Sequence, residues 1–158
     1  MVVSGTGHRP QKLGGFSKGA FNKLHTIATE WLLENKPEKV ISGMALGWDM
    51  ALAQASIDLD IPLIAAVPFK GQEGKWNLED RLKYFELLLY AERIVYVCEP
   101  GYSPWKMQVR NEWMVKNSDI VLAMWDGTEG GTNNCIRYAE DKMKKTIINL
   151  YDKFKNYG

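Results

Sequence analysis

The stretch from Met107 to Glu140, MQVRNEWMVKNSDIVLAMWDGTEGGTNNCIRYAE, decides the fold that the sequence predicts. Within it, Ile120 to Trp125 is a nearly unbroken apolar run that is too short for a typical helix, which predicts a buried strand. A glycine-bearing loop and the start of a helix follow this strand. In an open parallel sheet, ligands bind beside the loop that follows a strand's carboxyl end. The stretch therefore predicts an α/β fold with a ligand site after this strand.

Paired glycines open the helix that follows the predicted strand. Gly130, Gly131, Thr132 and Asn133 supply its first amide N–H groups, which have no partner inside the helix. The helix dipole favours an anion at this end, and two glycines let a ligand approach the backbone without an intervening side chain. We expect these four residues to hold a phosphate group.

Arg110 is the strongest candidate for a charged contact to that phosphate. On a helix it shares a face with Met107, Met114 and Asn117, at offsets of three, four and seven residues, so its guanidinium lies beside an apolar stripe. A partly buried arginine needs an anion. That anion is either a carboxylate of the protein, such as Glu112, or a nucleotide phosphate bound by a bidentate clamp.

Outside this stretch the chain alternates strands and helices. The further strands are expected at residues 2–4, 40–41, 61–67, 94–98 and 146–150. This alternation favours a Rossmann-like, doubly wound, mostly parallel sheet of about six strands, because each parallel crossover needs a helix. We expect residues 1–158 to form a single domain, since the length suits one core and no linker-like tract interrupts it.

Glycine-rich or polar segments follow four of these strands and are expected to meet at one edge of the sheet. The predicted ligand contacts beyond the paired glycines are Gly5, Thr6, Gly7, His8, Arg9, Ser42, Gly43, Met44, Gly47, Asp49 and Asp126. Asp49 lies in the first turn of a helix, where it either complements the dipole or accepts ribose hydroxyl groups. His8 is a better candidate proton carrier than His25, which lies inside the first helix. Among the tryptophans, Trp48, Trp76 and Trp125 border the predicted loops and are candidates to hold a flat base.

The composition limits the classes of partner. A net charge of +1 gives no electrostatic reason to expect nucleic acid as the main partner, and no apolar run approaches membrane-spanning length. Two cysteines without a secretory leader favour a reducing cytoplasm over a disulfide framework. No metal site is expected, because the two histidines and two cysteines lack the close spacings of a zinc site, and no cofactor is expected.

These motifs resemble the SMF/DprA and Lonely-guy (SLOG) superfamily. Met107, Arg110 and Gly131-Thr132 are similar to the Met-His-x-Arg-Lys segment and the P-G-G-x-G-T-x-x-E loop of the Lonely-guy phosphoribohydrolases. GTGHRPQKLGG (5–15) and ISGMALGWDMA (41–51) resemble more closely an uncharacterised branch found in bacteria and their phages. The resemblance implies a Rossmann-like fold, a nucleotide-type ligand and a homodimer.

The sequence also departs from the Lonely-guy motifs. Gln108 stands at the motif's His, Asn111 at its Lys, and Cys135 at the catalytic Glu. A small core residue is the favoured interpretation of Cys135, because neither histidine is near it in sequence. A carboxylate near the anomeric carbon must then come from elsewhere. Glu129 is the first candidate, with Asp126 and Asp49 as alternatives that spacing does not separate.

Three functions follow from the resemblance. The first is binding of a nucleoside phosphate or ribose phosphate, extended in an enzyme to hydrolysis of the N-glycosidic bond of a nucleoside 5′-monophosphate, with Arg110 and Glu129 as the catalytic pair. The second is non-catalytic sensing or sequestration of a nucleotide-derived signal such as an ADP-ribose derivative. The third is single-stranded DNA binding, which the balanced charge disfavours.

Overall fold

The computed structural model describes residues 1–157, and a six-stranded sheet runs through their centre. The strands are β1 (Val2–Gly7), β2 (Lys39–Ser42), β3 (Leu63–Val67), β4 (Arg93–Tyr96), β5 (Ile120–Met124) and β6 (Thr146–Asn149). They are arranged in the order β4-β3-β2-β1-β5-β6, and all neighbouring pairs are parallel. The structure confirms the predicted α/β Rossmann-like fold with six strands.

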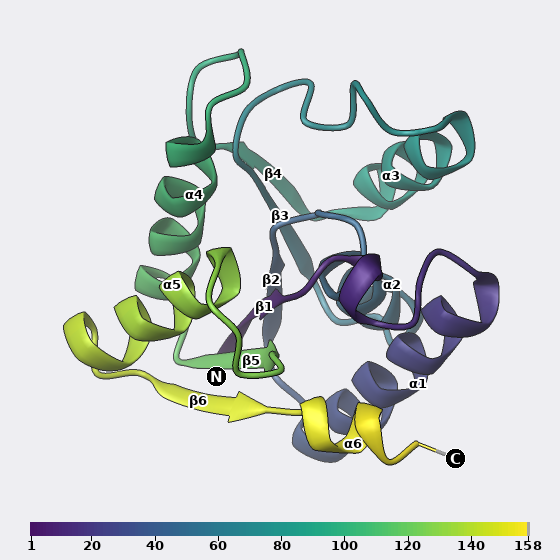
Figure 1. The fold of residues 1–158 in the computed structure, drawn as a ribbon, viewed down its shortest axis with the longest axis vertical. Coiled ribbons are helices and arrows are strands. Elements are labelled where there is room, and N and C mark those ends of the chain that lie inside the picture. The colour runs from purple at the N-terminus through teal and green to yellow at the C-terminus, as the bar shows by residue number, and fades with distance from the viewer. Residues whose placement is uncertain (158) are drawn as a thin grey trace.

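Helices cover both faces of the sheet (Figure 1). The elements are η1 (Pro10–Lys12), α1 (Lys18–Asn35), α2 (Trp48–Asp58), α3 (Leu78–Tyr90), α4 (Pro104–Lys116), α5 (Gly131–Arg137) with its π-helical continuation η2 (Tyr138–Lys142), and α6 (Tyr151–Lys155). Figure 1 shows α4 and α5 on one side of the sheet and α1, α2 and α3 on the other. Helix α6, in a tail whose structure the sequence did not indicate, buries Phe154 against the core beside α1.

Local sequence explains where the main helices begin and end. The Ser17 hydroxyl accepts a hydrogen bond from the Ala20 amide at 3.1 Å and caps α1, and Asn77 caps α3 in the same way. Helix α1 ends at Asn35. Its C-cap Lys36 has a left-handed φ of +47°, and Pro37, which cannot continue a helix, follows.

The core lies chiefly between the sheet and helices α1 and α2. Trp48 is fully buried there, and its indole N–H donates to the Leu122 carbonyl at 3.1 Å. The expectation that Trp48 holds a base is therefore wrong, because helix α2 points this side chain into the core. Trp76 packs edge-to-face against Tyr84, with ring centroids 5.3 Å apart.

The first strand is longer than predicted. Gly5, Thr6 and Gly7 belong to β1 and pair with the end of β5, whereas the sequence placed them in a loop. Helix α2 crosses so close to β1 that a Cβ on Gly7 would lie 2.6 Å from Trp48. These glycines allow α2 to pack tightly on β1. In a sequence, glycines with this role look the same as the glycines of a short turn, so the extension of β1 was not predicted.

Candidate functional site

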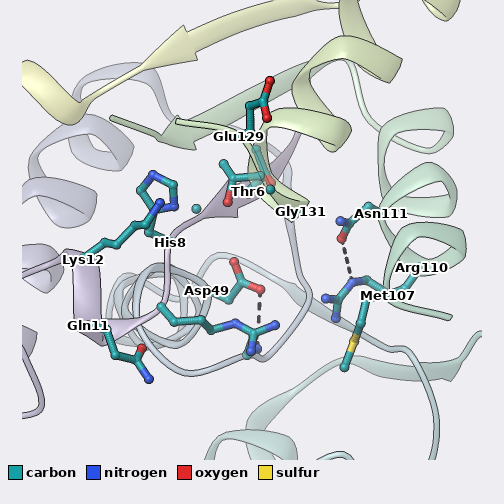
Figure 2. Close-up of a pocket in the computed structure, with 16 residues that line it drawn as sticks. Thr6, His8, Gln11, Lys12, Asp49, Met107, Arg110, Asn111, Glu129 and Gly131 are labelled. Atoms are coloured by element: carbon teal, nitrogen blue, oxygen red, sulfur yellow. Dashed lines mark hydrogen bonds between the residues drawn. The ribbon is translucent and has the colours of Figure 1, made fainter. Parts of the chain in front are cut away.

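A cavity of about 360 Å³ opens at the carboxyl edge of β1 and β5. Figure 2 shows Thr6 from β1, Asp49 from α2, Arg110 from α4 and Gly131 from α5 around this cavity. Of the predicted site residues, those that line it are Gly5, Thr6, Gly7, His8, Arg9, Asp49, Arg110, Glu129, Gly130, Gly131 and Thr132. Segments that are far apart in the sequence thus meet at the carboxyl edge of the sheet, as the predicted parallel strands implied.

The glycine turn on this cavity is open. Gly130 has a φ of +139°, and a Cβ added at Gly130 or Gly131 would meet no other atom within 4 Å. Within residues 1–157, the amides of Gly131, Thr132 and Asn133 donate no hydrogen bond to the protein. Such amides are available to an anion.

Arg110 is buried at the opposite wall, with 3% of its surface exposed. Its Nη1 donates to the carbonyl oxygens of Gly43 at 2.6 Å and Ala66 at 3.3 Å, and its Nε donates to Asn111 Oδ1 at 2.9 Å. Glu112, the protein carboxylate considered as its partner, instead accepts from Gln108. Among the described residues Nη2 has no acceptor, so part of the guanidinium is available to a ligand.

Asp49 lies close to Arg110 and is also buried. Its Oδ2 accepts from the Ala45 amide at 3.4 Å. Gly43 separates the two side chains so tightly that an added Cβ would lie 2.6 Å from Arg110 Nη1 and 2.8 Å from Asp49 Oδ2. Burial raises the pKa of Asp49 although Arg110 opposes the rise, and burial lowers the pKa of Arg110 although Asp49 opposes the fall.

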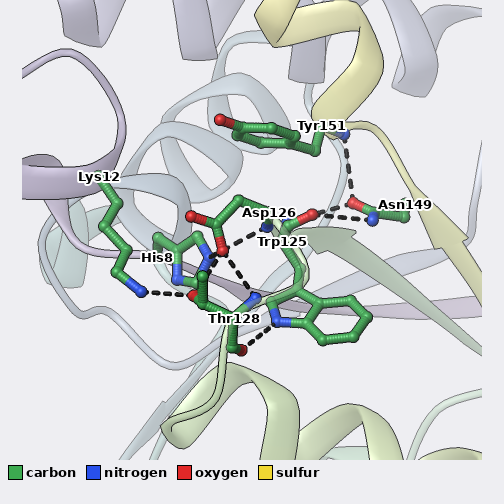
Figure 3. Close-up of polar contacts among 7 residues, drawn as sticks. All are labelled: His8, Lys12, Trp125, Asp126, Thr128, Asn149 and Tyr151. Carbon is green, nitrogen blue, oxygen red and sulfur yellow. Dashed lines mark hydrogen bonds and ion pairs between the residues drawn. The ribbon is translucent and has the colours of Figure 1, made fainter.

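A second polar network closes the side of the cavity beside the glycine turn (Figure 3). His8 Nε2 lies 2.7 Å from Asp126 Oδ1, and this oxygen also accepts from the amide of Thr128 at 3.0 Å and from its hydroxyl. Lys12 Nζ donates to the same hydroxyl. The hydrogen bonds from Thr128, with a smaller contribution from His8, hold the pKa of Asp126 well below its usual range. Trp125 packs on the far side of this loop and donates to the Thr128 carbonyl at 2.8 Å.

Several predicted contacts lie beneath or beside the cavity rather than on it. The Ser42 hydroxyl donates to the Asp49 carbonyl at 2.7 Å, and Asn133 Oδ1 accepts from Arg137 at 3.3 Å. Met44 is fully buried. The remaining residues of this kind are Gly43, which packs under Arg110, Gly47, which packs against the His8 carbonyl, and Asp126, which binds His8.

The cavity also contains residues that sequence reasoning missed. They are Gln11, Lys12, Met107 and Asn111. Lys12 reaches the cavity because η1 turns the chain back directly after Arg9, and Pro10 at the start of η1 was the available indication of such a turn. Asn111 follows Arg110 in α4.

Cys135, which stands where the Lonely-guy motif that the sequence resembles has its Glu, is 1% exposed, and burial raises its pKa to about 11. It is the small core residue that the sequence favoured. No group of three His, Cys, Asp or Glu side chains in residues 1–157 is arranged to hold a metal ion. No helix in the same residues is long and apolar enough to cross a membrane.

Comparison with known proteins shows which family this chain matches. A model of the YspA SLOG family matches residues 3–152. The SPbeta prophage-derived protein YoqJ of Bacillus subtilis (strain 168) is 34% identical over 143 residues, which cover 80% of this chain and 81% of YoqJ.

Two solved structures share the fold. DNA processing protein A (DprA) of Streptococcus pneumoniae has a TM-score of 0.66 and 19% identity over 93% of this chain and 49% of DprA, so the chain spans about half of that protein. The molybdenum cofactor binding protein of Rippkaea orientalis has a TM-score of 0.57 and 16% identity over 99% of this chain and 82% of that protein.

Proposed function

The chain belongs to the YspA SLOG family, and from this premise we propose that residues 1–158 form one domain that binds a nucleoside phosphate or a related ribose phosphate in the cavity. The observation that carries the proposal is the pairing of an open glycine turn with a buried arginine across a single cavity. Unpartnered helix amides and a guanidinium are the two groups that proteins use most for phosphate.

The phosphate is proposed to lie on the amides of Gly130, Gly131 and Thr132. Arg110 supplies a positive charge from the opposite wall, and Arg9 and Lys12 add positive charge at the rim. Arg110 needs no rearrangement to do this, because Gly43 and Ala66 already fix its Nη1. A cation held in place before binding loses little conformational entropy when the ligand arrives.

The sugar is proposed to face Asp49, whose carboxyl group accepts hydrogen bonds from ribose hydroxyl groups. The cavity volume of about 360 Å³ lies near the lower end of the roughly 300–1,000 Å³ typical of small-molecule sites. This size favours a mononucleotide over a dinucleotide.

Hydrolysis of the N-glycosidic bond is the reaction that we propose for this ligand. The transition state carries positive charge at the anomeric carbon and needs nearby carboxylates. Glu129 and Asp49 both line the cavity, whereas the Cys135 thiol at the family's Glu position is buried. Incubation with AMP, CMP or GMP tests this chemistry: free base and ribose 5-phosphate should accumulate in equal amounts, and no release above a blank at high protein concentration would contradict it.

Non-catalytic binding is a second candidate, favoured by the buried Cys135 at the position where the Lonely-guy motif has its Glu. A sensor would be stabilised by its ligand without changing it. Thermal denaturation with AMP or ADP-ribose, followed by chromatography of the recovered ligand, separates the two candidates. An intact ligand with a raised melting temperature supports sensing, and consumed AMP supports hydrolysis.

We also propose that two copies of the chain pair through α3. One face of α3 carries apolar residues at intervals of four, three and four residues, the spacing by which two helices pack in a coiled coil: Leu78, Leu82, Phe85 and Leu89. This face is not covered by the chain itself, because Leu82 is 59% and Leu89 84% exposed. Arg81 Nε is buried without a hydrogen-bond partner among the described residues. In a parallel pair of α3 helices, Arg81 of one copy and Glu86 of the other flank the seam with opposite charges.

A further inference from the structure

The chain contains two histidines, and each is paired with an aspartate. His8 Nε2 lies 2.7 Å from Asp126 Oδ1, and His25 Nε2 lies 2.8 Å from Asp58 Oδ2. The His25 pair joins the outer surfaces of α1 and α2. The His8 ring is only 7% exposed and lines the cavity. The two pairs share their chemistry and differ in their surroundings.

Asp126 is held in one orientation. The Thr128 amide and hydroxyl both donate to its Oδ1, and Lys12 donates to that hydroxyl from the other side. A carboxylate oxygen fixed in this way accepts a hydrogen bond from His8 only if Nε2 carries the proton. The backbone N–H of Asp126 also points at Nε2, at 3.1 Å, a contact that would need a lone pair on this nitrogen. We assign the proton to Nε2 because the carboxylate contact is the shorter of the two, and an unprotonated nitrogen and a carboxylate oxygen 2.7 Å apart would repel each other. The carboxylate contact therefore selects the Nε2–H tautomer.

This tautomer leaves the other ring nitrogen with a lone pair. Nδ1 of His8 makes no hydrogen bond to any described residue, although its ring forms part of the cavity wall. A histidine held by an aspartate with its second nitrogen free is the arrangement by which enzymes accept a proton.

We propose that His8 is the catalytic proton acceptor of this cavity and that Asp126 is its positioning residue. The inference rests on the proposed hydrolysis of a nucleoside 5′-monophosphate. Water forms a bond from its oxygen to the anomeric carbon while the bond from that carbon to the base nitrogen breaks. The bonding electron pair leaves with the base, one proton of the water passes to Nδ1, and the base takes up a proton from solvent.

Charged groups surround His8. Asp126 from the β5–α5 loop faces Nε2, Lys12 from η1 lies beyond Thr128, and Asp49, Glu129, Arg9 and Arg110 line the same cavity. Of these groups, the Asp126 carboxylate is the one that contacts the ring and holds its orientation. Removal of this carboxylate should therefore lower kcat more than it changes KM.

The experiment compares His8→Gln, Asp126→Asn and the matched control His25→Gln with the unaltered chain. The kcat and KM for release of adenine from AMP are measured for each variant, and AMP affinity is measured by calorimetry. His8→Gln should slow release about 10²–10⁴-fold and leave the AMP affinity within a few-fold. Asp126→Asn should lower kcat and leave KM and the AMP affinity within a few-fold. His25→Gln should change neither the rate nor the affinity.

Adenine release by His8→Gln at the unaltered rate would overturn the proposal, and so would AMP binding by the unaltered chain without any release. Absence of nucleotide binding by the unaltered chain would instead overturn the proposed function itself. Because His8 is buried, circular dichroism must show that the variant is folded. As a measurement that needs no variant, NMR of the unaltered chain should show AMP moving the His8 ring resonances and not those of His25. Unmoved His8 resonances with AMP bound would also refute the proposal.

Discussion

Substitution of Gly131 by alanine tests the glycine turn without disturbing the fold. A Cβ at this position would meet no atom of the protein within 4 Å, and Gly131 has no positive φ that would strain an alanine. Because Gly131 is the first residue of α5, alanine should leave stability unchanged or raise it by up to about 1 kcal/mol. The protein itself should tolerate the methyl group.

A phosphate on the turn should not tolerate it. The methyl group would hold the phosphate away from the amides of Gly131 and Thr132. Loss of one hydrogen bond to a charged group costs about 1.5–3 kcal/mol, which corresponds to AMP binding that is about 10- to 100-fold weaker. Affinity should fall while stability holds or rises, a combination that general damage to the fold does not produce.

Calorimetric titration with AMP and urea denaturation measure the two quantities. Gly19→Ala is the matched control, because Gly19 lies in the first turn of α1, where an added Cβ has similar freedom. The control should gain stability and keep full AMP affinity. If Gly131→Ala also keeps full affinity, the phosphate does not lie on this turn.

Four further predictions concern the cavity wall, the buried thiol and the outer surface. Gly43→Ala would place a Cβ 2.6 Å from Arg110 Nη1 and should lower the free energy of unfolding by about 1–3 kcal/mol; a urea midpoint equal to that of the unaltered chain would show that Arg110 is not held tightly. Iodoacetamide at about pH 8 should spare Cys135 in the native chain, because the thiolate is the reactive form and burial raises this pKa to about 11. The folded pKa of Cys135 lies above the ordinary value of 9.0. The stability that the protonated thiol contributes is therefore present below about pH 9 and is lost as pH rises toward 11. Cys135→Ala should remove this decrease in the free energy of unfolding, and an unchanged decrease in the variant would show that the thiol does not cause it. Leu82→Glu should yield monomers in sedimentation, whereas Leu33→Glu, on an equally exposed leucine of α1, should not; dimers that survive Leu82→Glu would exclude α3 as the interface.

The strands and the loops that follow them could be predicted from the sequence, because apolar runs and glycine pairs are local patterns. The apolar run at 120–125 and the glycines at 130–131 predicted β5, the turn and its place on the carboxyl edge. The shared helix face of Arg110 and Met114 predicted that this arginine is buried. Each of these features depends on residues within one or two helical turns.

Features that depend on contacts between distant segments were not readable. The sequence gives no spacing from which the 2.7 Å contact between His8 and Asp126, 118 residues apart, can be inferred. The same holds for Arg110, whose Nη1 donates to the carbonyl groups of Gly43, in the loop after β2, and Ala66, in β3. Asp126 was predicted as a ligand contact because it follows a strand, but the loop turns its carboxylate to His8.

The most direct test of a phosphate site formed by the glycine turn and Arg110 is a calorimetric comparison of AMP with adenosine. The two ligands share base and sugar and differ only in the phosphate. We predict that AMP binds at least about 10-fold more tightly than adenosine, as expected if a charged hydrogen bond depends on the phosphate. Equal affinity for both, or binding of adenosine alone, would contradict the account.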